Sequence, residues 1–240
     1  MRNGHTAAWV TVAGVFMAPV ASAHIELAGP AFAGTTYTGA FSVAHGCPNP
    51  EDASTKLDTD SVTVTIPSGV TARAVDSTLG TAVSTVVNGN ITTITWAKNQ
   101  SLPYDIDFYS LPVRMSLPNT PWTYIYFDAV QVCHDAVSDK DVTVDWVGTV
   151  DQTTALPDGA PPPEPAPKLF LLPARTPGWN KYTVTSDVTA LKSIFGDAEI
   201  VWAGNAAYSI NPNYAALIGT EPNTTQLTTI PANTEIWVKY

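Results

Sequence analysis

The stretch TVVNGNITTITW (residues 85–96) holds two runs of β-branched residues on either side of Asn88-Gly89-Asn90. Valine, isoleucine and threonine favour extended strands, and asparagine and glycine tolerate the positive φ of a tight hairpin turn. The stretch therefore predicts a β-hairpin. SVTVTI (residues 61–66) precedes it, alternates polar with apolar residues and ends in a Pro-Ser-Gly turn. That alternation predicts a further strand with one buried face.

Similar strands recur on the C-terminal side of the hairpin. Tyr109, Leu111, Val113 and Met115 alternate with polar or small residues, and VTVDWV (residues 142–147) is another strand candidate. Short strands at this spacing, separated by proline and glycine turns, are typical of two packed antiparallel sheets. We expect an all-β chain built on an immunoglobulin-like β-sandwich.

The composition changes after the predicted sandwich. Residues 156–178 contain eight prolines, and proline-rich segments form extended, semi-rigid spacers. LFLL (residues 169–172) is too apolar for a free linker, so we expect this second half to dock on a domain. Residues 179–240 predict a small, mainly-β module. Four tryptophans are expected to pack in the core or between strands and not to form binding platforms: Trp96, Trp122, Trp202 and Trp237.

The N-terminus has the three parts of a secretory signal peptide. Arg2 is basic, residues 7–20 are apolar, and Ala21-Ser22-Ala23 is a small-residue cleavage signal. The apolar run is too short for a transmembrane helix, so we expect a periplasmic or secreted protein with no membrane insertion after processing. The predicted organisation is a signal peptide at 1–23, a β-sandwich at 24–152, a Pro-rich linker at 153–178 and a small β module at 179–240.

The chain is strongly acidic. It has 11 basic and 21 acidic residues and a formal charge of −10, which becomes −11 when the leader with its single arginine is removed. Binding to nucleic acid depends on Lys and Arg side chains that displace counterions from phosphates, and binding to anionic lipid depends on the same residues. The charge therefore argues against both partners.

The chain contains two cysteines, Cys47 and Cys133. In an oxidising compartment an even number of cysteines predicts a disulfide bond. The alternative is ligation of a soft Cu(I) ion by the two thiolates, which a disulfide would rule out.

Cleavage after Ala23 would free the α-amine of His24. The amine nitrogen and the imidazole Nδ1 of such a residue can close a chelate ring around one cation, and nitrogen donors of this kind suit Cu(II) best among common divalent ions. The amine must lose its proton to bind, so the affinity should fall in acid. The alternative is that His24 is merely the first residue of the processed chain.

Six pieces of sequence follow one another between His24 and Val150. They are HIEL (24–27), FSVAHGC (41–47), VTVTIPSGV (62–70), TW with LP (95–96 and 102–103), YFDAVQVC (126–133) and DWVG (145–148). In this order they resemble the YcnI copper-binding family.

The resemblance implies a cupredoxin-like sandwich with a solvent-facing copper site. It implies that His24 forms a single-histidine brace for Cu(II), supported by a carboxylate and a tryptophan. Trp146 matches the tryptophan through its Asp-Trp-Val-Gly context. The family has a glutamate shortly after Leu-Pro, where this chain has Asp105 and Asp107. Alternation places both on one strand face; we favour Asp105, and Glu26 stays open as a third donor.

Two further histidines flank the cysteines. His45 precedes Cys47 and His134 follows Cys133, so a disulfide would bring the two histidines near each other. The resemblance makes His45 part of a structural turn. The alternative is a joint second metal site at His45 and His134, because histidine is the commonest metal ligand.

These features predict an exported copper-binding protein that acts in copper trafficking or scavenging, and so in copper homeostasis, and not an enzyme. The expected partners are the copper ion and a periplasmic copper chaperone or a membrane copper transporter. One alternative is a cell-surface adhesion or interaction protein that uses its C-terminal module. Another is a copper-dependent polysaccharide mono-oxygenase, which would need His45 or His134 as a second histidine beside His24.

Overall fold

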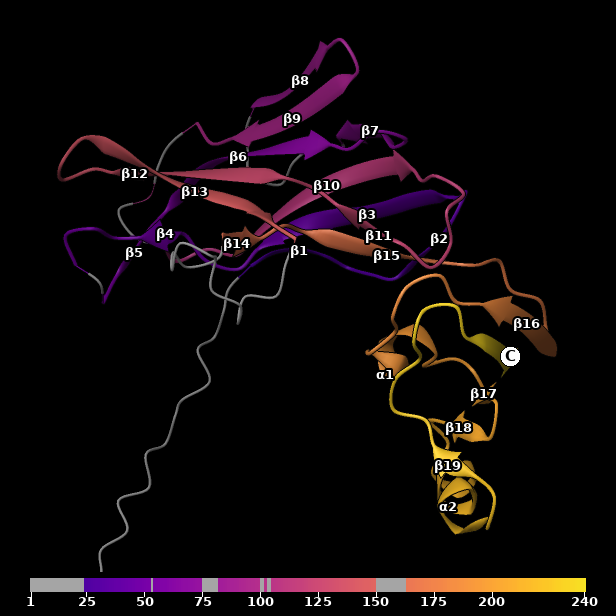
Figure 1. The fold of residues 1–240 in the computed structure, drawn as a ribbon. Coiled ribbons are helices and arrows are strands. Elements are labelled where there is room, and N and C mark those ends of the chain that lie inside the picture. The colour runs from indigo at the N-terminus through magenta and orange to yellow at the C-terminus, as the bar shows by residue number, and fades with distance from the viewer. Residues whose placement is uncertain (1–23, 53, 75–81, 100–101, 103–104, 150–162) are drawn as a thin grey trace, which may run out of the picture.

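The computed structural model describes residues 24–52, 54–74, 82–99, 102, 105–149 and 163–240. The predicted signal peptide and the first part of the predicted linker lie outside these residues. The described chain forms a β-sandwich up to residue 172 and a separate five-stranded sheet with two short helices from residue 179 onward (Figure 1).

Two sheets form the sandwich. The first has the strand order β1-β3-β10-β7 and the second the order β14-β13-β12-β6-β9-β8. The strands of the first sheet are β1 (Ile25–Leu27), β3 (Thr36–Val43), β10 (Tyr109–Ser116) and β7 (Thr71–Ala74). Those of the second are β14 (Glu164–Pro165), β13 (Lys140–Gly148), β12 (Ala129–Asp135), β6 (Thr59–Ile66), β9 (Ile91–Ala97) and β8 (Ala82–Asn88).

Smaller sheets close the sandwich at its ends. One has the order β11-β15-β2, and a two-stranded ladder joins β4 to β5. Their strands are β11 (Tyr124–Tyr126), β15 (Lys168–Leu172), β2 (Ala31–Phe32), β4 (Cys47–Pro48) and β5 (Lys56–Leu57).

The core lies between the two large sheets because their strands alternate buried and more exposed residues. Leu111, Val113 and Met115 of β10 face inward, as do Val62 and Val64 of β6. Aromatic rings fill the centre: the Phe41 centroid lies 5.5 Å from that of Phe127 and 6.0 Å from that of Trp96. The prediction of an all-β sandwich is confirmed.

The β8–β9 hairpin is the one that the sequence predicts. Asn88 pairs with Ile91, and Gly89 adopts a φ of 61° in the turn between them. The hairpin projects from the sandwich in Figure 1, and β8 is the outermost strand of its sheet. Its tip exposes apolar side chains, and residues 82–97 contain no charged residue. Val86, Val87 and Ile91 are each more than half exposed.

The proline-rich segment contributes two strands to the sandwich. β14 pairs with β13, and β15 pairs with both β11 and β2. Residues 163–172 therefore belong to the sandwich and not to the linker predicted at 153–178. The reason is the apolar run Leu169–Leu172, which is buried and overrides the spacer tendency of the neighbouring prolines.

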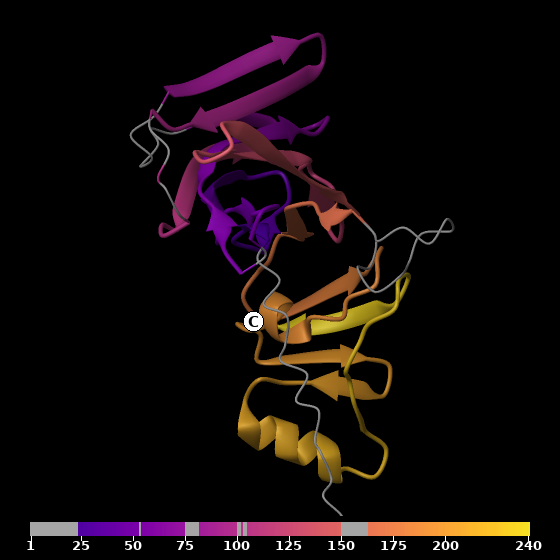
Figure 2. The same cartoon turned by 90° about the vertical axis from the view of Figure 1, so that its left-hand side faces the viewer.

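The C-terminal unit is a sheet of order β16-β20-β17-β18-β19. In Figure 2 the helix α2 lies at the end of this unit farthest from the sandwich. Its elements are β16 (Trp179–Thr183), α1 (Leu191–Ile194), β17 (Ile200–Ala203), β18 (Ala206–Tyr208), α2 (Pro212–Thr220), β19 (Thr225–Gln226) and β20 (Glu235–Lys239). The prediction of a small β module describes this unit.

Three sandwich residues lie in the core of the C-terminal unit: Trp122, Phe170 and Leu172. The Trp122 ring is surrounded by Phe170, Tyr182 and Phe195, with centroids between 5.6 and 6.2 Å away. Its backbone has a φ of 65°, which is costly for a bulky residue. The two units thus share a buried aromatic junction.

The tryptophans divide into two groups. Trp96 and Trp122 are buried, as predicted. Trp237 is 44% exposed, so the expectation that it packs in a core is wrong. In β20 the neighbours Ile236 and Val238 take the inward positions, and alternation places Trp237 on the opposite face.

Cys47 and Cys133 form the predicted disulfide bond, with a Cα–Cα distance of 5.9 Å. Both sulfur atoms are therefore unavailable as thiolate ligands. Among the residues that the structure describes, no helix is long and apolar enough to cross a membrane.

Candidate metal centre

His24 lies at one end of the sandwich, directly before β1. Its neighbour Ile25 pairs with Val43, the last residue of β3, and Val43 pairs in turn with Tyr109, the first residue of β10. The histidine is therefore placed where three strands of the first sheet begin or end.

Trp146 meets His24 from the second sheet. The two ring centroids are 6.0 Å apart and the ring planes are nearly perpendicular, at 87°. Trp146 lies on β13 and is only 4% exposed. The structure thus brings together two of the residues singled out in the sequence, which are 122 positions apart in the chain.

A buried glutamine holds the indole in place. Trp146 Nε1 donates a hydrogen bond to Gln131 Oε1 at 3.1 Å. Gln131 Nε2 donates to the carbonyl of His45 at 2.9 Å and to Thr59 Oγ1 at 2.7 Å. The indole N–H is therefore used within the protein, and the ring is the part of Trp146 that the His24 imidazole contacts.

The sequence analysis did not identify Gln131. Its position between Val130 and Val132 suggests a solvent-facing residue, because the apolar neighbours would be expected inside. The structure shows the opposite: Gln131 is completely buried, and both valines are only partly buried. The one available signal was the two-residue spacing to Cys133, whose disulfide also requires an inward position.

Asp105 lies against the His45–Gly46 turn. A Cβ atom placed on Gly46 would be 3.3 Å from the Asp105 Cγ and only 1.6 Å from the carbonyl oxygen of Leu57. Only glycine fits here, which explains the glycine of the His-Gly-Cys motif. The Asp105 Oδ1 atom is buried and has no hydrogen-bond partner among the residues described.

The other carboxylates are placed differently. Asp107 is exposed, and Glu26 is exposed on the outer face of the first sheet. Within the described chain, no group of three or more His, Cys, Asp or Glu side chains is arranged to hold a metal ion. His24, Asp105 and Asp107 therefore do not form a three-residue cluster of that kind.

A buried charge cluster lies beneath the segment that carries Asp105. The Asp58 carboxylate is 1% exposed, forms an ion pair with Lys98 and accepts a hydrogen bond from the Tyr109 hydroxyl. It also accepts one from the backbone N–H of Leu102 at 2.8 Å. Burial, followed by the hydrogen bond to Asp58, raises the pKa of Tyr109 far above its usual range, so the phenol stays a donor. The cluster anchors the chain three residues before Asp105.

His45 and His134 each have partners of their own. His45 Nδ1 lies 2.6 Å from the carbonyl oxygen of Gly46, which fits the predicted structural turn. His134 Nδ1 lies 3.1 Å from Asp141 Oδ1, and its Nε2 lies 3.5 Å from Asp139. The positions thus give no support to a joint metal site at the two histidines.

The donors at this end of the sandwich fit a copper ion in part. The His24 imidazole is a nitrogen donor, its amine becomes a second one if the preceding residues are removed, and Cu(II) prefers such ligands. The unpartnered Asp105 Oδ1 is the kind of buried carboxylate oxygen that a cation satisfies. Trp146 offers the His24 ring a fixed neighbour and supplies no donor atom.

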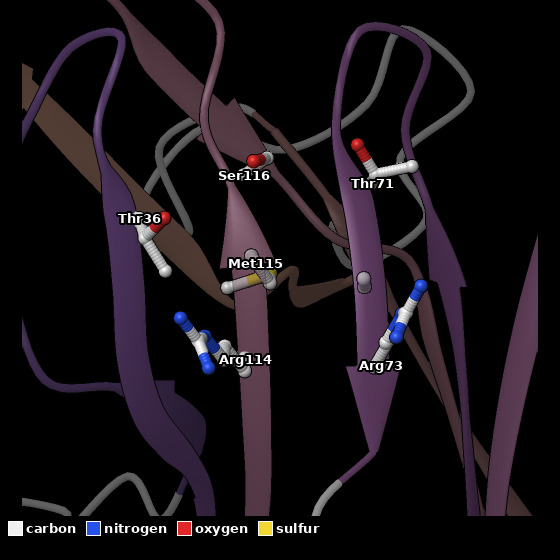
Figure 3. A pocket seen from close by; sticks show the side chains of 7 residues that line it. Thr36, Thr71, Arg73, Arg114, Met115 and Ser116 are labelled. Atoms are coloured by element: carbon white, nitrogen blue, oxygen red, sulfur yellow. The ribbon is translucent and has the colours of Figure 1, made fainter.

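A hollow of about 470 Å³ lies elsewhere, on the outer face of β3, β10 and β7 (Figure 3). Arg73 and Arg114 are directly opposite each other on neighbouring strands, and their guanidinium groups extend to different sides in the figure. Thr36, Thr71 and Ser116 add hydroxyl groups. Two arginines repel a cation, so this hollow is not a copper site.

Several solved structures resemble the chain weakly. An uncharacterized protein from Nocardia farcinica with an immunoglobulin-like fold is 22% identical, with 62% of this chain and 98% of that chain covered and a TM-score of 0.46. The major pilin subunit BcpA of Bacillus cereus is 10% identical, with 87% and 51% covered and a TM-score of 0.30. A C-terminal fragment of the major pilin GBS80 of Streptococcus agalactiae is 13% identical, with 91% and 78% covered and a TM-score of 0.35.

No curated protein matches the chain. A family model described as a domain of unknown function, DUF1775, matches residues 24–171. The matched region starts at His24 and ends within β15, so it covers the whole sandwich, including the two strands of the proline-rich segment. The chain belongs to the DUF1775 family, to which YcnI also belongs.

Proposed function

We propose that this protein is an exported copper-binding protein that carries or scavenges Cu(II) through His24. The observation that carries the proposal is the contact between the His24 and Trp146 rings, which joins the two sheets at the end of the sandwich. Removal of the residues before His24 would add its amine to its imidazole as a second nitrogen donor. The disulfide suits the oxidising compartment that export implies.

Each neighbouring residue has a defined part in this site. Trp146 packs against the His24 imidazole, and Gln131 fixes the indole by accepting its N–H. Asp105 is favoured over Asp107 as the oxygen donor, because Asp105 Oδ1 is buried without a partner whereas Asp107 is exposed. The Asp58 cluster anchors the segment that presents Asp105.

The site suits binding better than catalysis. A copper mono-oxygenase would need a second histidine next to His24, and His45 and His134 are engaged by Gly46 and Asp141. A copper chaperone or a membrane copper transporter remains the proposed partner, because a single-histidine site exchanges its ion more readily than a fully enclosed one.

The proposal is tested on protein that begins at His24. Titration with Cu(II), followed by electron paramagnetic resonance and competition with a chelator, should show one site with nitrogen ligands. His24→Ala, or one extra residue before His24, should abolish this site because each removes a nitrogen donor. His134→Gln is the matched control and should leave the affinity unchanged. Equal binding by the extended and the native N-terminus would refute the role of the amine.

The carboxylate is tested separately. We expect Asp105→Asn to weaken Cu(II) binding by about tenfold or more, as loss of a ligand or of its support does, and Asp107→Asn to have little effect. The reverse order would show that Asp107 is the donor. Because affinity depends on deprotonation of the amine and imidazole, binding should also weaken as the pH falls.

A further inference from the structure

Three tryptophans lie on the outer face of the C-terminal sheet. In β16, Trp179 and Lys181 alternate with the buried Asn180. Lys181 pairs with Trp237 on β20, and Trp237 pairs on its other side with Trp202 on β17. The Lys181 Nζ atom lies 5.5 Å from the Trp237 ring centroid, which confirms that they share one face.

This face exposes large aromatic surfaces. Trp179 is 52% exposed and Trp237 is 44% exposed, whereas Trp96, Trp122 and Trp146 are almost completely buried. Indole is the largest side chain and is costly to leave in water, so exposed tryptophans gathered on one face indicate a binding surface.

The turn before β16 holds Trp179 in this outward position. The Asn180 side chain accepts hydrogen bonds from the backbone N–H and the hydroxyl of Thr176. Its Nδ2 donates to the carbonyls of Thr176 and Gly178. Gly178 has a φ of 90°, a conformation that favours glycine. The Pro-Gly-Trp-Asn sequence is thus a locked turn that presents the indole to solvent before any ligand arrives.

The charges around the tryptophans cancel one another. Lys181 pairs with Glu235 at 2.7 Å, and Lys239 pairs with Glu199 at 2.8 Å. The Tyr214 hydroxyl of α2 donates to Glu199 at 3.0 Å. In a chain with a formal charge of −10, this face is locally neutral and edged by hydrogen-bonding groups. Such a surface complements an uncharged ligand that offers both apolar faces and hydroxyl groups.

We propose that this face of the C-terminal unit binds a neutral polysaccharide built of pyranose sugars. The C–H face of a pyranose ring stacks on an indole, and its hydroxyl groups can exchange hydrogen bonds with the Lys, Glu and Tyr groups at the edge. Trp179 and Trp237 occupy diagonal positions on neighbouring strands, roughly 7–8 Å apart, so two rings of one sugar chain can lie on them. The inference does not depend on copper binding.

A proline-rich peptide is the competing ligand for exposed aromatic rings. Such peptides bind in aromatic-lined grooves, whereas Trp179, Trp237 and Trp202 stand on one face of an extended sheet. The sheet face therefore favours the sugar chain. Nucleic acid and anionic lipid fit poorly, because Lys181 and Lys239 are already neutralised by carboxylates.

The test uses the full chain and defined sugars. Depletion of the protein by microcrystalline cellulose and by chitin measures binding to insoluble chains, and tryptophan fluorescence during titration with cellohexaose and chitohexaose measures it in solution. We expect binding to at least one of the two sugars, with a change in tryptophan emission. Trp179→Ala and Trp237→Ala should each weaken it about tenfold, as truncation of a binding aromatic does.

The controls separate this outcome from others. Phe108→Ala removes an aromatic side chain that is 66% exposed on the sandwich and should bind sugar like the unchanged chain. Circular dichroism should show that the tryptophan variants remain folded. The proposal is overturned if neither neutral sugar binds, if the double variant binds as well as the unchanged chain, or if a proline-rich peptide alone binds. A dimer that the double variant converts to a monomer, without sugar binding, would overturn it in favour of a contact between copies.

Discussion

Gln131 joins parts of the candidate metal centre that are far apart in the sequence. It accepts a hydrogen bond from Trp146 and donates two, to His45 O and Thr59 Oγ1. Only an amide side chain can accept and donate in this way from one buried position. The residue thus couples the tryptophan next to His24 to the turn next to Asp105.

Replacing Gln131 by leucine should be strongly destabilising. The change leaves the Trp146 N–H, the His45 carbonyl and the Thr59 hydroxyl without their partner, and we expect a loss of about 3 kcal/mol in the free energy of unfolding. Urea denaturation measures it. Gln226→Leu, at an exposed position of β19, is the matched control and should change stability by less than about 0.5 kcal/mol. Equal effects of the two changes would contradict the network.

His134 should make stability depend on pH. Its hydrogen bond with Asp141 raises the pKa of the imidazole, and the negative charges of Asp141, Asp60 and Asp139 add to this against a loss from desolvation. The raised pKa means that the protonated form is favoured in the fold. Its stabilisation is complete below the ordinary histidine pKa of about 6.5 and is lost as the pH rises through the raised value.

The comparison of His134→Gln with the unchanged chain isolates this effect. The variant should be less stable than the unchanged chain near about pH 5.5, and the difference should shrink near about pH 8.5. Thermal unfolding at the two pH values measures both differences. His24 and His45 titrate in both proteins, so their contributions cancel. A difference that grows with pH would contradict the assignment.

At the scale of strands, the disulfide ties β4 to β12. It closes a loop between positions 86 residues apart, and both cysteines are fully buried. Replacing both with alanine should lower the free energy of unfolding by about 2–5 kcal/mol, chiefly because the unfolded chain is no longer cross-linked. Urea denaturation of the reduced, unchanged chain should give the same value as the variant. A reduced chain as stable as the oxidised one would contradict this.

Alternation predicts strands well but not always which face is buried. The pattern of β6 and of the β8–β9 hairpin is plain in the sequence, and the structure follows it. In β12 the apolar residues Val130 and Val132 suggest the wrong inward face, because Cys133 must face the disulfide and Gln131 follows it inward. In β15, the proline-rich surroundings conceal a strand that the apolar run Leu169–Leu172 stabilises.

For the whole molecule, the Trp122 junction links the stability of the two units. Trp122→Ala removes a buried ring from the core that the sandwich and the C-terminal sheet share, and we expect a loss of about 3–5 kcal/mol. Trp179→Ala is the matched control, because its ring is half exposed, and should cost less than about 1 kcal/mol. Calorimetry measures both. A Trp122 variant as stable as the control would show that the units do not depend on this junction.

The sequence predicted more of the sandwich than of the site. His24 and Trp146 were found because one follows a cleavage signal and the other lies in a recognisable strand, and their rings are in contact. The support around them was not found: Gln131, and the Asp58, Lys98 and Tyr109 cluster, act through buried contacts between distant segments. The exposed Trp237 was missed because an aromatic residue in a strand is usually buried.

The uncharged hairpin of β8 and β9 has a consequence for the behaviour of the protein in concentrated solution. No described strand covers the outer edge of β8, and that edge carries neither charge nor proline to discourage pairing with another chain. Copies are instead kept apart by the mutual repulsion of their acidic surfaces. This repulsion reaches about 10 Å at 0.1 M salt but only about 3 Å at 1 M. The colloidal stability of the protein therefore depends on ionic strength, and salt should bring it closer to self-association through β8.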